Sequence, residues 1–282
     1  MTSRFAEYCR GKERAALAAQ LFPYRTVESA EQFGIEKIGN VWTRKLFDGD
    51  FFRSARACES DLPITNLVFV ESQEGNTVAD DPSTLGGGDT DKHLIYEGLS
   101  RIDADAVLAG ASTASNNELV FSVWHPELVA LRLRRGRARH PAQVVVCSKS
   151  ALPIETALMF QEPSLPVYLI TTSDAAVSLR LQVLTHPWVH VIDGGCPLSM
   201  RTALRKLKTH AINTVSAVGG RTTARTLLSQ RVVQDLYLTT SAESAGAPNT
   251  PLVDGALSAK RVVIKEGTGP ETGVRFVHYL CR

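Results

Sequence analysis

Residues 214–228, TVSAVGGRTTARTLL, decide the fold because two glycines join a buried strand to a helix. The segment TVSAV is apolar on both faces, and the residues after Gly219-Gly220 have helical spacing. A helix that begins directly after a strand presents free N–H groups and the positive end of its dipole to an anion. The pattern favours two interpretations about equally, a phosphate site and a tight turn with a helix cap. The candidate phosphate-binding residues are Gly219, Gly220, Arg221, Thr222 and Thr223.

Short apolar runs like TVSAV recur along the chain. Most are apolar on both faces, as strands of a parallel sheet covered by helices must be, whereas half-exposed antiparallel strands alternate. Helical patterns lie between these runs. The sequence therefore predicts an α/β fold with a mixed, mostly parallel sheet and helices on both faces. The other predicted strands are 66–70, 105–109, 143–147, 166–170, 188–192 and 234–240.

Three predicted helices have clear starts. Pro126 opens PELVALRLRR and Gly136 follows it, in keeping with proline at the start of a helix and glycine after its end. A second helix follows Ser173, and Ser199 caps a third. The apolar residues that share one face are Val177, Leu181 and Leu184 in the second helix and Met200, Ala203, Leu204 and Leu207 in the third.

The two ends of the chain differ from its middle. RVVIK at 261–265 and VRFVHYL at 274–280 are joined by a link too short for a crossover helix, which predicts an antiparallel hairpin at one edge of the sheet. The N-terminal part shows an Ala/Leu-rich helix around 13–21 and then irregular sequence. We expect residues 1–64 to be an extension packed on a main domain of residues 65–282.

Composition indicates a globular protein close to neutral charge. The 282 residues carry 31 Lys and Arg against 29 Asp and Glu, a formal net charge of +2, which gives no strong field for nucleic acid. Five scattered cysteines without a C-x-x-C pair argue against a disulfide framework and a zinc site. No stretch approaches the roughly 20 apolar residues that span a bilayer. We expect a cytoplasmic protein that binds neither nucleic acid nor membranes.

Two further strand ends could contact a cofactor. Small residues follow the strand 105–109, and Ser148-Lys149 after 143–147 offer a hydroxyl and a cation that would suit the 2′-phosphate of NADPH. A solvated loop is the simpler interpretation of Ser148-Lys149. Ligands of open α/β sheets lie beyond the carboxyl ends of the strands, so adjacent glycine-rich ends could hold the two halves of a dinucleotide. These candidate residues are Gly110, Ala111, Ser112, Thr113, Ser148 and Lys149.

Other signatures are missing or weak. Neither G-x-G-x-x-G nor a Walker motif occurs, which disfavours a Rossmann dehydrogenase and a P-loop enzyme. His186 and His190 have i,i+4 spacing, but Pro187 denies them a shared helical face, so we expect no metal. The basic run RLRRGRARH at 132–140 is interpreted as a solvated face.

Three segments in order resemble the riboflavin-pathway pyrimidine reductases. They are SQEG at 72–75, DADAVLAGAST at 103–113 and GGRTT at 219–223, and the resemblance spans residues 65–282, including the terminal hairpin. It implies a dihydrofolate-reductase-like fold. The zinc deaminase domain fused to some members needs H-x-E and P-C-x-x-C motifs, and neither occurs.

The resemblance implies an NADPH-dependent reductase. NADPH would lie across 110–113 and 219–223, with Ser148-Lys149 near its 2′-phosphate. Hydride would pass to a C=O or C=N of a small heterocyclic or sugar-like substrate, such as 5-amino-6-(5-phosphoribosylamino)uracil, and Glu74 or an ordered water would donate the proton. Ser72 and Asn117 fall at substrate-binding positions.

The substrate side departs from the family pattern. Val218 stands where an acidic residue usually precedes Gly-Gly, Asn117 replaces an aspartate, and no basic residue matches near Trp124. Glu74 replaces a further aspartate and keeps its carboxylate on a longer arm. Loss of fixed donors and acceptors lowers affinity for a polar substrate. The alternative function is an NADP(H)-binding sensor or interaction protein without catalysis.

We also expect a homodimer. The family generally dimerises through the part of the sheet that holds the terminal hairpin, and an exposed sheet edge needs a cover. The N-terminal extension is the alternative cover. Its aromatic residues are Trp42, Phe47, Phe51 and Phe52.

Overall fold

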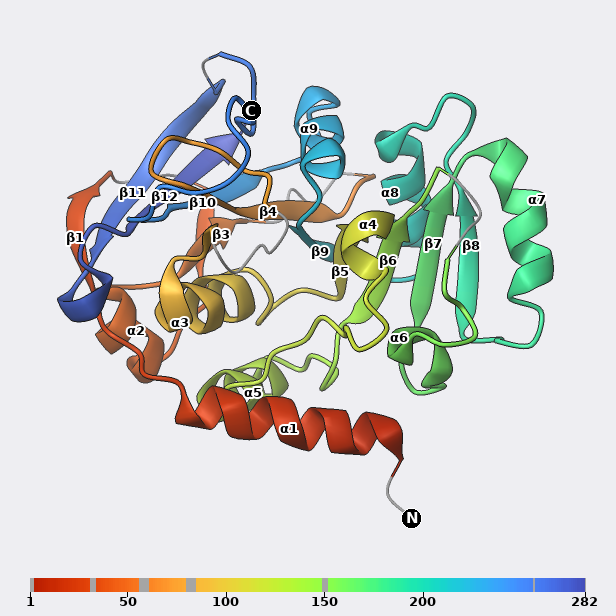
Figure 1. The fold of residues 1–282 in the computed structure, drawn as a ribbon, viewed down its shortest axis with the longest axis horizontal. Coiled ribbons are helices and arrows are strands. Elements are labelled where there is room, and N and C mark those ends of the chain that lie inside the picture. Colours follow the sequence, from red (N-terminus) through yellow and green to blue (C-terminus); the bar gives the residue numbers. More distant parts are fainter. Residues whose placement is uncertain are drawn as a thin grey trace.

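A ten-stranded mixed sheet forms the centre of the computed structural model (Figure 1), which describes residues 3–30, 34–55, 61–79, 85–148, 152–255 and 257–281. Its strands are β1 (Tyr24–Ser29), β4 (Ile64–Glu71), β5 (Ala106–Gly110), β6 (Ala142–Val146), β7 (Val167–Thr171), β8 (Val189–Asp193), β9 (Thr214–Val218), β10 (Asp235–Thr240), β11 (Ala259–Gly267) and β12 (Arg275–Cys281). Their order across the sheet is β1-β11-β12-β10-β4-β9-β5-β6-β7-β8. A separate pair is formed by β2 (Ile35–Lys37) and β3 (Phe52–Ser54).

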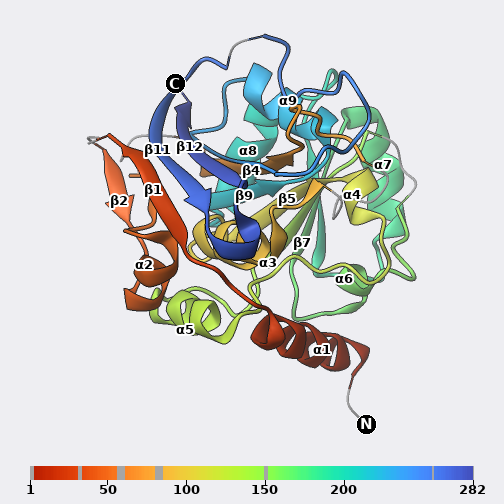
Figure 2. The ribbon, with the colours of Figure 1, turned by 60° about the vertical axis from the view of Figure 1, so that its left-hand side comes forward.

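Helices cover both faces of the sheet (Figure 2). They are α1 (Arg4–Ala18), α2 (Val41–Phe47), α3 (Gly88–Thr90), the π-helix η2 (Asp91–Leu99), α4 (Ala111–Ala114), α5 (Pro126–Arg134), α6 (Leu158–Gln161), α7 (Ser173–Gln182), α8 (Met200–Thr209), α9 (Arg221–Ser229) and the 3₁₀ turn η3 (Gly269–Glu271). Residues of η2, α5, α6 and α7 join one buried apolar cluster, and residues of α8 and α9 join a second. The sheet separates the two clusters, as the two-sided apolar strands predict.

The predicted α/β class is confirmed. Strands β10, β4, β9, β5, β6, β7 and β8 pair in parallel, and β12 pairs antiparallel with β10. Each strand predicted between residues 66 and 240 begins and ends within two residues of an observed one. These strands are predicted accurately because a strand that is buried on both faces must be apolar on both faces, which is visible in its sequence.

The predicted hairpin forms, but it does not end the sheet. Strands β11 and β12 pair antiparallel, and β1 adds to the outer side of β11. The prediction of a helix around 13–21 followed by irregular structure is therefore wrong. The helix α1 starts at Arg4, and the strand β1 follows it. Only Tyr24 of YRTVES is buried, so β1 carries little apolar pattern of its own and depends on its pairing with β11.

The N-terminal segment packs on the terminal strands through aromatic and polar contacts. The Phe47 ring lies 5.0 Å from the Phe51 ring and 5.5 Å from the Phe276 ring of β12, centroid to centroid. Buried Asp235 of β10 accepts hydrogen bonds from the Ser54 backbone N–H at 2.9 Å and from His278 at 2.8 Å. The segment before residue 65 thus covers the outer edge and one face of these strands.

The basic run at 132–140 is not a solvated face, which corrects the sequence interpretation. Arg132 is 1% exposed, and its Nη1 donates to the carbonyl oxygens of Arg101 and Ala104, both at 2.8 Å. Arg137 Nε donates to Asp103 Oδ1 at 2.9 Å. Burial opposes ionisation of Asp103, but hydrogen bonds from Arg135 and Arg137 outweigh it and lower its pKa. Carbonyl and carboxylate partners distant in sequence account for the buried guanidinium groups.

The apolar residues that the sequence pattern places on one face of α7 and just after it are exposed in the structure. Ala176 and Leu179 are its buried residues, whereas Val177, Leu181 and Leu184 are 63–74% exposed. Helix α8 follows the sequence pattern instead, because Ser199 caps it and its predicted apolar face is buried. Among the described helices none is long and apolar enough to cross a membrane.

Candidate cofactor and substrate site

The two glycine-rich strand ends predicted from the sequence meet in the structure. Strands β5 and β9 are parallel neighbours, so 110–113 and 219–223 lie at the same edge of the sheet. A Cβ atom added to Gly110 would lie 2.6 Å from Thr223 Oγ1, and one added to Gly219 would lie 3.0 Å from Thr113 Cγ2. Each junction therefore packs a threonine against the glycine of the other, and larger residues at these glycines would separate them.

The backbone at this edge suits an anion. Gly219 and Gly220 have φ of +59° and +76°, which side-chain-bearing residues rarely adopt. Gly220 is the N-cap of α9 and the first turn of the helix has no side-chain cap, so N–H groups at its start remain available to a ligand. These N–H groups, with the dipole of a nine-residue helix, fit the diphosphate of a dinucleotide.

The side chains around the two junctions are exposed or half-buried, but they differ in whether they are already engaged in hydrogen bonds within the protein. Ser112 and Thr222 are exposed, and Ala111, Thr113 and Thr223 are half-buried. Arg221 Nε, by contrast, donates to the Pro251 carbonyl oxygen at 2.8 Å and so ties α9 to the 251 loop. The threonine hydroxyls are therefore better placed as ligand donors than the Nε of Arg221.

The third predicted strand end is only partly described. Ser148 is exposed, just beyond the carboxyl end of β6, which pairs with β5. Lys149 lies outside the described residues.

Ser72 and Glu74 occupy one compact loop after β4. Buried Ser72 donates to Glu74 Oε2 at 2.9 Å, and Ser244 donates to the other carboxylate oxygen. Hydrogen bonds from Ser244 and Ser72 lower the pKa of Glu74, so the loop stabilises its ionised form. The carboxylate can accept a hydrogen bond from a ligand, but it is poorly suited to donate a proton.

Asn117 lies in the exposed loop after α4. Its side-chain oxygen accepts a hydrogen bond from Thr156 at 3.2 Å, and its carbonyl accepts one from the Leu158 N–H at 2.8 Å. These bonds hold the loop to the start of α6. A ligand would compete with Thr156 for the Asn117 side chain.

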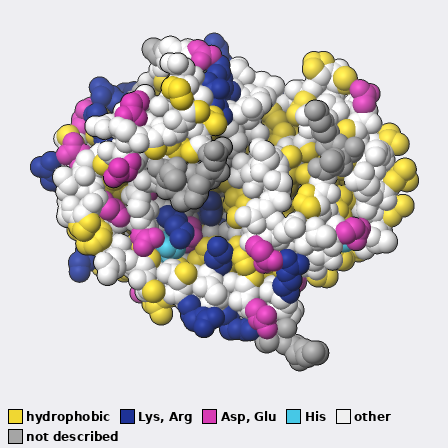
Figure 3. All heavy atoms as spheres, in the orientation of Figure 1, with side chains coloured by type: hydrophobic (Ala, Val, Ile, Leu, Met, Phe, Trp, Pro, Cys, Tyr) yellow, Lys and Arg dark blue, Asp and Glu magenta, His cyan; other side chains and the backbone are white. Residues whose placement is uncertain are grey.

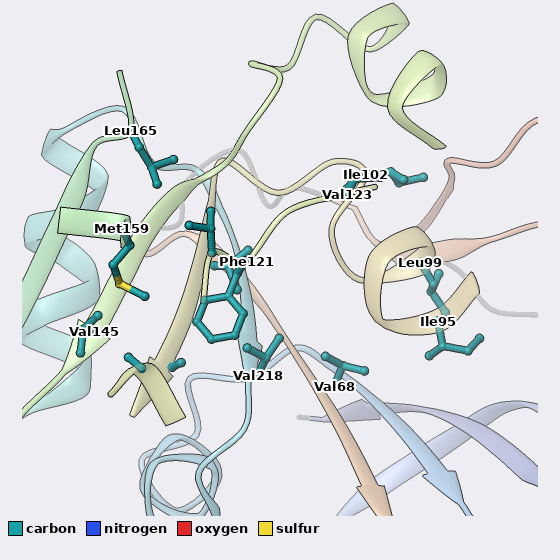
Figure 4. Close-up of a cluster of buried hydrophobic side chains, with 14 of the residues drawn as sticks. Val68, Ile95, Leu99, Ile102, Phe121, Val123, Val145, Met159, Leu165 and Val218 are labelled. Carbon is teal, nitrogen blue, oxygen red and sulfur yellow. The ribbon is translucent and has the colours of Figure 1, made fainter. Parts of the chain in front are cut away.

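Of the positions that depart from the family pattern, Val218 lies in packed apolar surroundings (Figure 4), whereas Glu74 and Asn117 are exposed. Val218, Phe121 and Trp124 are 3%, 7% and 5% exposed. Figure 4 shows the Phe121 ring directed toward Val218, with Met159 and Val145 on its other side, and all four belong to one apolar cluster. A buried apolar side chain thus precedes Gly219, at the position where the resemblance implies an acidic one.

Sequence reasoning missed a group of buried acids near the carboxyl end of β10. Thr239 donates to Asp91 Oδ1, and Glu271 Oε1 accepts from the Thr90 N–H at 3.1 Å. Burial raises the pKa of Asp91 to about 7, despite the hydrogen bond from Thr239, and also raises that of Glu271. No local motif marks these acids, because η2, β10 and η3 bring them together from distant segments. Within the described residues, no cluster of three or more His, Cys, Asp or Glu side chains could hold a metal ion.

Comparison with known proteins identifies the family and the fold. The family described as the RibD C-terminal domain matches residues 78–269, a range that begins after Glu74. A pyrimidine reductase-like protein of Corynebacterium diphtheriae has a TM-score of 0.64 at 20% identity, covering 78% of this chain and 92% of its own. Riboflavin biosynthesis reductase Rib7 of Saccharomyces cerevisiae has a TM-score of 0.56 at 14% identity, covering 80% and 93%. RibD of Acinetobacter baumannii has a TM-score of 0.59 at 15% identity, covering 85% and 62%.

These likenesses cover 78–85% of this chain, and at such identities they show the fold alone. Sequence comparison with curated proteins gives no match. The family match spans more than half of the chain and includes two of the three segments that first suggested the resemblance, 103–113 and 219–223, whereas SQEG at 72–75 precedes it. The protein therefore belongs to the RibD C-terminal domain family, the pyrimidine reductases of riboflavin biosynthesis.

Proposed function

We propose that this chain is an NADPH-dependent oxidoreductase that transfers a hydride to a C=O or C=N of a small heterocyclic or sugar-like substrate. The observation that carries the proposal is the interlock of the β5 and β9 ends, where glycines, threonine hydroxyls and the uncapped start of α9 share one edge of the sheet. Diphosphate recognition needs such a surface, because it relies on close backbone approach and N–H donors.

In this proposal the residues of the chain bind and orient the cofactor. The N–H groups at 221–223 and the hydroxyls of Thr113 and Thr223 would hold the diphosphate. Ser148, together with Lys149 outside the described residues, would contact the 2′-phosphate. NADPH supplies the hydride when bound, and the protein contributes position, electrostatics and exclusion of competing reactions.

The proton is assigned to water in preference to Glu74. A general acid works best when its pKa is near the working pH, whereas hydrogen bonds from Ser244 and Ser72 lower the pKa of Glu74. As a carboxylate, Glu74 would accept a hydrogen bond from an amino or hydroxyl group of the substrate and orient it. Ser72 would act through Glu74, because its hydroxyl already donates to that carboxylate.

The family substrate 5-amino-6-(5-phosphoribosylamino)uracil is the first candidate. A Thermotoga maritima relative of this fold, with a TM-score of 0.54 and 19% identity, is named as a reductase of that compound. The substrate half of this chain offers Ser72, Asn117 and Glu74 for polar contacts. Against it stand Val218, which is buried where the family pattern has an acidic residue, and the lack of a matching basic residue near Trp124.

The burial of Val218 and Trp124 favours one alternative, an NADP(H)-binding sensor or interaction protein without catalysis. Packed apolar side chains provide no donors or acceptors for a phosphorylated substrate. In that case the cofactor half would function alone, and bound NADP(H) would report the redox state of the pool to a partner.

Cofactor binding and turnover separate the two functions. We expect NADPH to bind more tightly than NADH, and NADPH absorbance to fall at 340 nm when a substrate from a panel of ribosylaminopyrimidines, pterins and simple carbonyl compounds is added. Binding of NADPH without oxidation by any member of the panel would support the sensor. Failure to bind NADPH would contradict both functions.

We further propose a cytoplasmic homodimer. Because β1 occupies the outer side of β11, the two-fold contact cannot be edge-to-edge pairing on that strand. A face of the terminal strands remains the proposed contact. Light scattering on the full chain tests the dimer, and a monomer at all concentrations would contradict it.

A further inference from the structure

A cavity outside the proposed cofactor site lies beside α9, toward the end of the helix away from Gly220. Its volume is about 320 Å³, at the small end of the range of ligand pockets, roughly 300–1,000 Å³. Most of its walls come from the C-terminal half of α9, the turn before β10, the loop at 253–258 and the end of β12. Figure 3 shows basic and hydrophobic side chains side by side over this part of the molecule, at the top of the view. The apolar wall is formed by Leu228, Val233, Val253 and Leu257.

The charged wall of the cavity has one cation in excess. Arg225 forms an ion pair with Asp254, whereas the side chain of Arg231 makes no hydrogen bond or ion pair with any other described residue. Burial raises the pKa of the Cys281 thiol to about 12, so this residue is neutral near pH 7. Two arginines against one aspartate leave the described lining positively charged, and the unpaired guanidinium is that of Arg231.

Arg231 also occupies a backbone position where glycine is normally preferred. It follows the end of α9 with φ of +51°, and its N–H donates to the Leu228 carbonyl oxygen at 3.0 Å. The left-handed region is sterically unfavourable for a residue with a side chain. Ala211 occupies the corresponding position after α8, with φ of +62°. The strained turn fixes the point from which the Arg231 side chain reaches the cavity.

We propose that this cavity binds a small carboxylate with an apolar body, held by Arg231 and packed against the apolar wall. A guanidinium presents paired N–H donors that match a carboxylate in a fork. Ligand sites typically combine apolar walls with a few polar groups that orient the ligand. An inorganic phosphate would leave the apolar wall without contacts, and an alcohol would form no ion pair with Arg231, whose exposed guanidinium would stay hydrated. The site does not rest on the proposed reductase function.

The cavity is distinct from the cofactor site, although both use α9. The proposed diphosphate contacts lie at 219–223, whereas the cavity is lined by Arg225, Leu228 and Ser229 and by the turn that follows the helix. A helix rises about 1.5 Å per residue, so the two sites are separated along its axis. Loss of the carboxylate should therefore leave NADPH affinity unchanged.

The test uses hexanoate and the full chain. We expect saturable binding of hexanoate by titration calorimetry or ligand-observed NMR, with at least tenfold weaker binding of hexan-1-ol and of inorganic phosphate. Equal binding of hexanoate and hexan-1-ol would overturn the proposal by showing a purely apolar cavity. Absence of saturable hexanoate binding would overturn it as well.

Two glycine substitutions separate binding from stability. Arg231→Gly relieves the left-handed strain, so we expect a melting temperature at or above wild type together with at least tenfold weaker hexanoate binding. Ala211→Gly is the matched control at the end of α8 and should raise the melting temperature without changing hexanoate binding. Arg231→Gln, which keeps a side chain but removes the charge, should lose binding to the same degree. Hexanoate affinity of wild-type strength in Arg231→Gly or Arg231→Gln would overturn the assignment.

Discussion

The two halves of the strand-end surface have diverged to different extents. At the ends of β5 and β9, Gly219, Gly220 and the hydroxyl-bearing residues at 112–113 and 222–223 are half-buried or exposed, whereas Gly110 is buried. Immediately before Gly219, Val218 is buried in an apolar cluster with Phe121, at a position where the family resemblance implies an acidic residue. The proposed cofactor half is thus accessible, whereas Val218 in the proposed substrate half belongs to the core.

The difference reflects how each half recognises its ligand. A diphosphate is bound largely by backbone N–H groups, which require glycines and a helix start that one short segment encodes. A heterocyclic substrate is bound by side chains from several loops, and each can be replaced without breaking a strand or helix. The cofactor half is therefore constrained by the fold, whereas the substrate half changes residue by residue.

The largest expected effect tests whether the substrate half is core. Phe121→Ala should lower the free energy of unfolding by about 3–5 kcal/mol, because truncating a buried aromatic side chain removes apolar contacts and leaves a cavity. NADPH affinity of the folded variant should stay within a factor of two or so, since Phe121 is not among the proposed diphosphate contacts. Denaturant unfolding measures the loss. Leu133→Ala on the exposed side of α5 is the control, with an expected change of less than about 1 kcal/mol.

A loss below about 1 kcal/mol in Phe121→Ala would contradict the comparison. It would indicate that Phe121 lines an open substrate pocket rather than the core.

The second prediction concerns the buried acid near β10. Burial holds the pKa of Asp91 at about 7, above its ordinary value of 3.8, so the folded protein binds a proton that the unfolded chain has lost. Stability should fall as pH rises from about 4 to about 7 and then level off, by at most roughly 4 kcal/mol from this group. Asp91→Asn removes the titration and should flatten the curve. A wild-type curve that is already flat over this range would refute the assignment.

The sequence predicts the parallel strands and the β9–α9 junction well, because the signals are local. TVSAV is buried on both faces, and the glycines after it have the positive φ that the turn requires. Val218 could also be identified as a departure from the family pattern, because it directly precedes the Gly-Gly pair and the signal is local in sequence. Its packing against Phe121 could not, since that contact joins residues almost one hundred positions apart.

The errors have a common cause, which is dependence on partners distant in sequence. Strand β1 has one buried residue and forms by pairing with β11. Arg132 has the appearance of a surface cation until the carbonyl groups of Arg101 and Ala104 are placed beside it. Asp91 becomes a proton-binding group only because burial between distant segments raises its pKa, against the effect of the hydrogen bond from Thr239. The hydrophobic pattern of a segment indicates which of its residues tend to be buried. For β1, Arg132 and Asp91, contacts with residues distant in sequence determine the structure instead.

The third prediction tests the cofactor half directly. Gly220→Val should weaken NADPH binding about a hundredfold, or roughly 2.7 kcal/mol, because a side chain at φ +76° would displace the turn that presents the N–H groups of α9. Gly136→Val is a close match in strain, since Gly136 has φ of +71° with nothing within 4 Å of an added Cβ. Fluorescence titration of NADPH measures both variants. Equal NADPH affinity in the two folded variants would reduce the glycine pair to a simple turn.

The smallest expected effect sharpens the comparison at a single hydroxyl. Thr223→Val replaces Oγ1 by a methyl group of similar size and so preserves the packing against Gly110 while removing one donor to the proposed diphosphate. A hydrogen bond to a charged group contributes about 1.5–3 kcal/mol, so at the lower limit of that range we expect NADPH to bind roughly tenfold more weakly. Thr226→Val, one turn further along α9, removes a hydroxyl that donates to the Thr222 carbonyl oxygen at 2.8 Å and should leave NADPH affinity unchanged. Equal effects of the two substitutions would mean that Thr223 acts through the stability of α9. A loss confined to Thr223→Val would assign its hydroxyl to the cofactor and show that the cofactor half uses side chains as well as backbone.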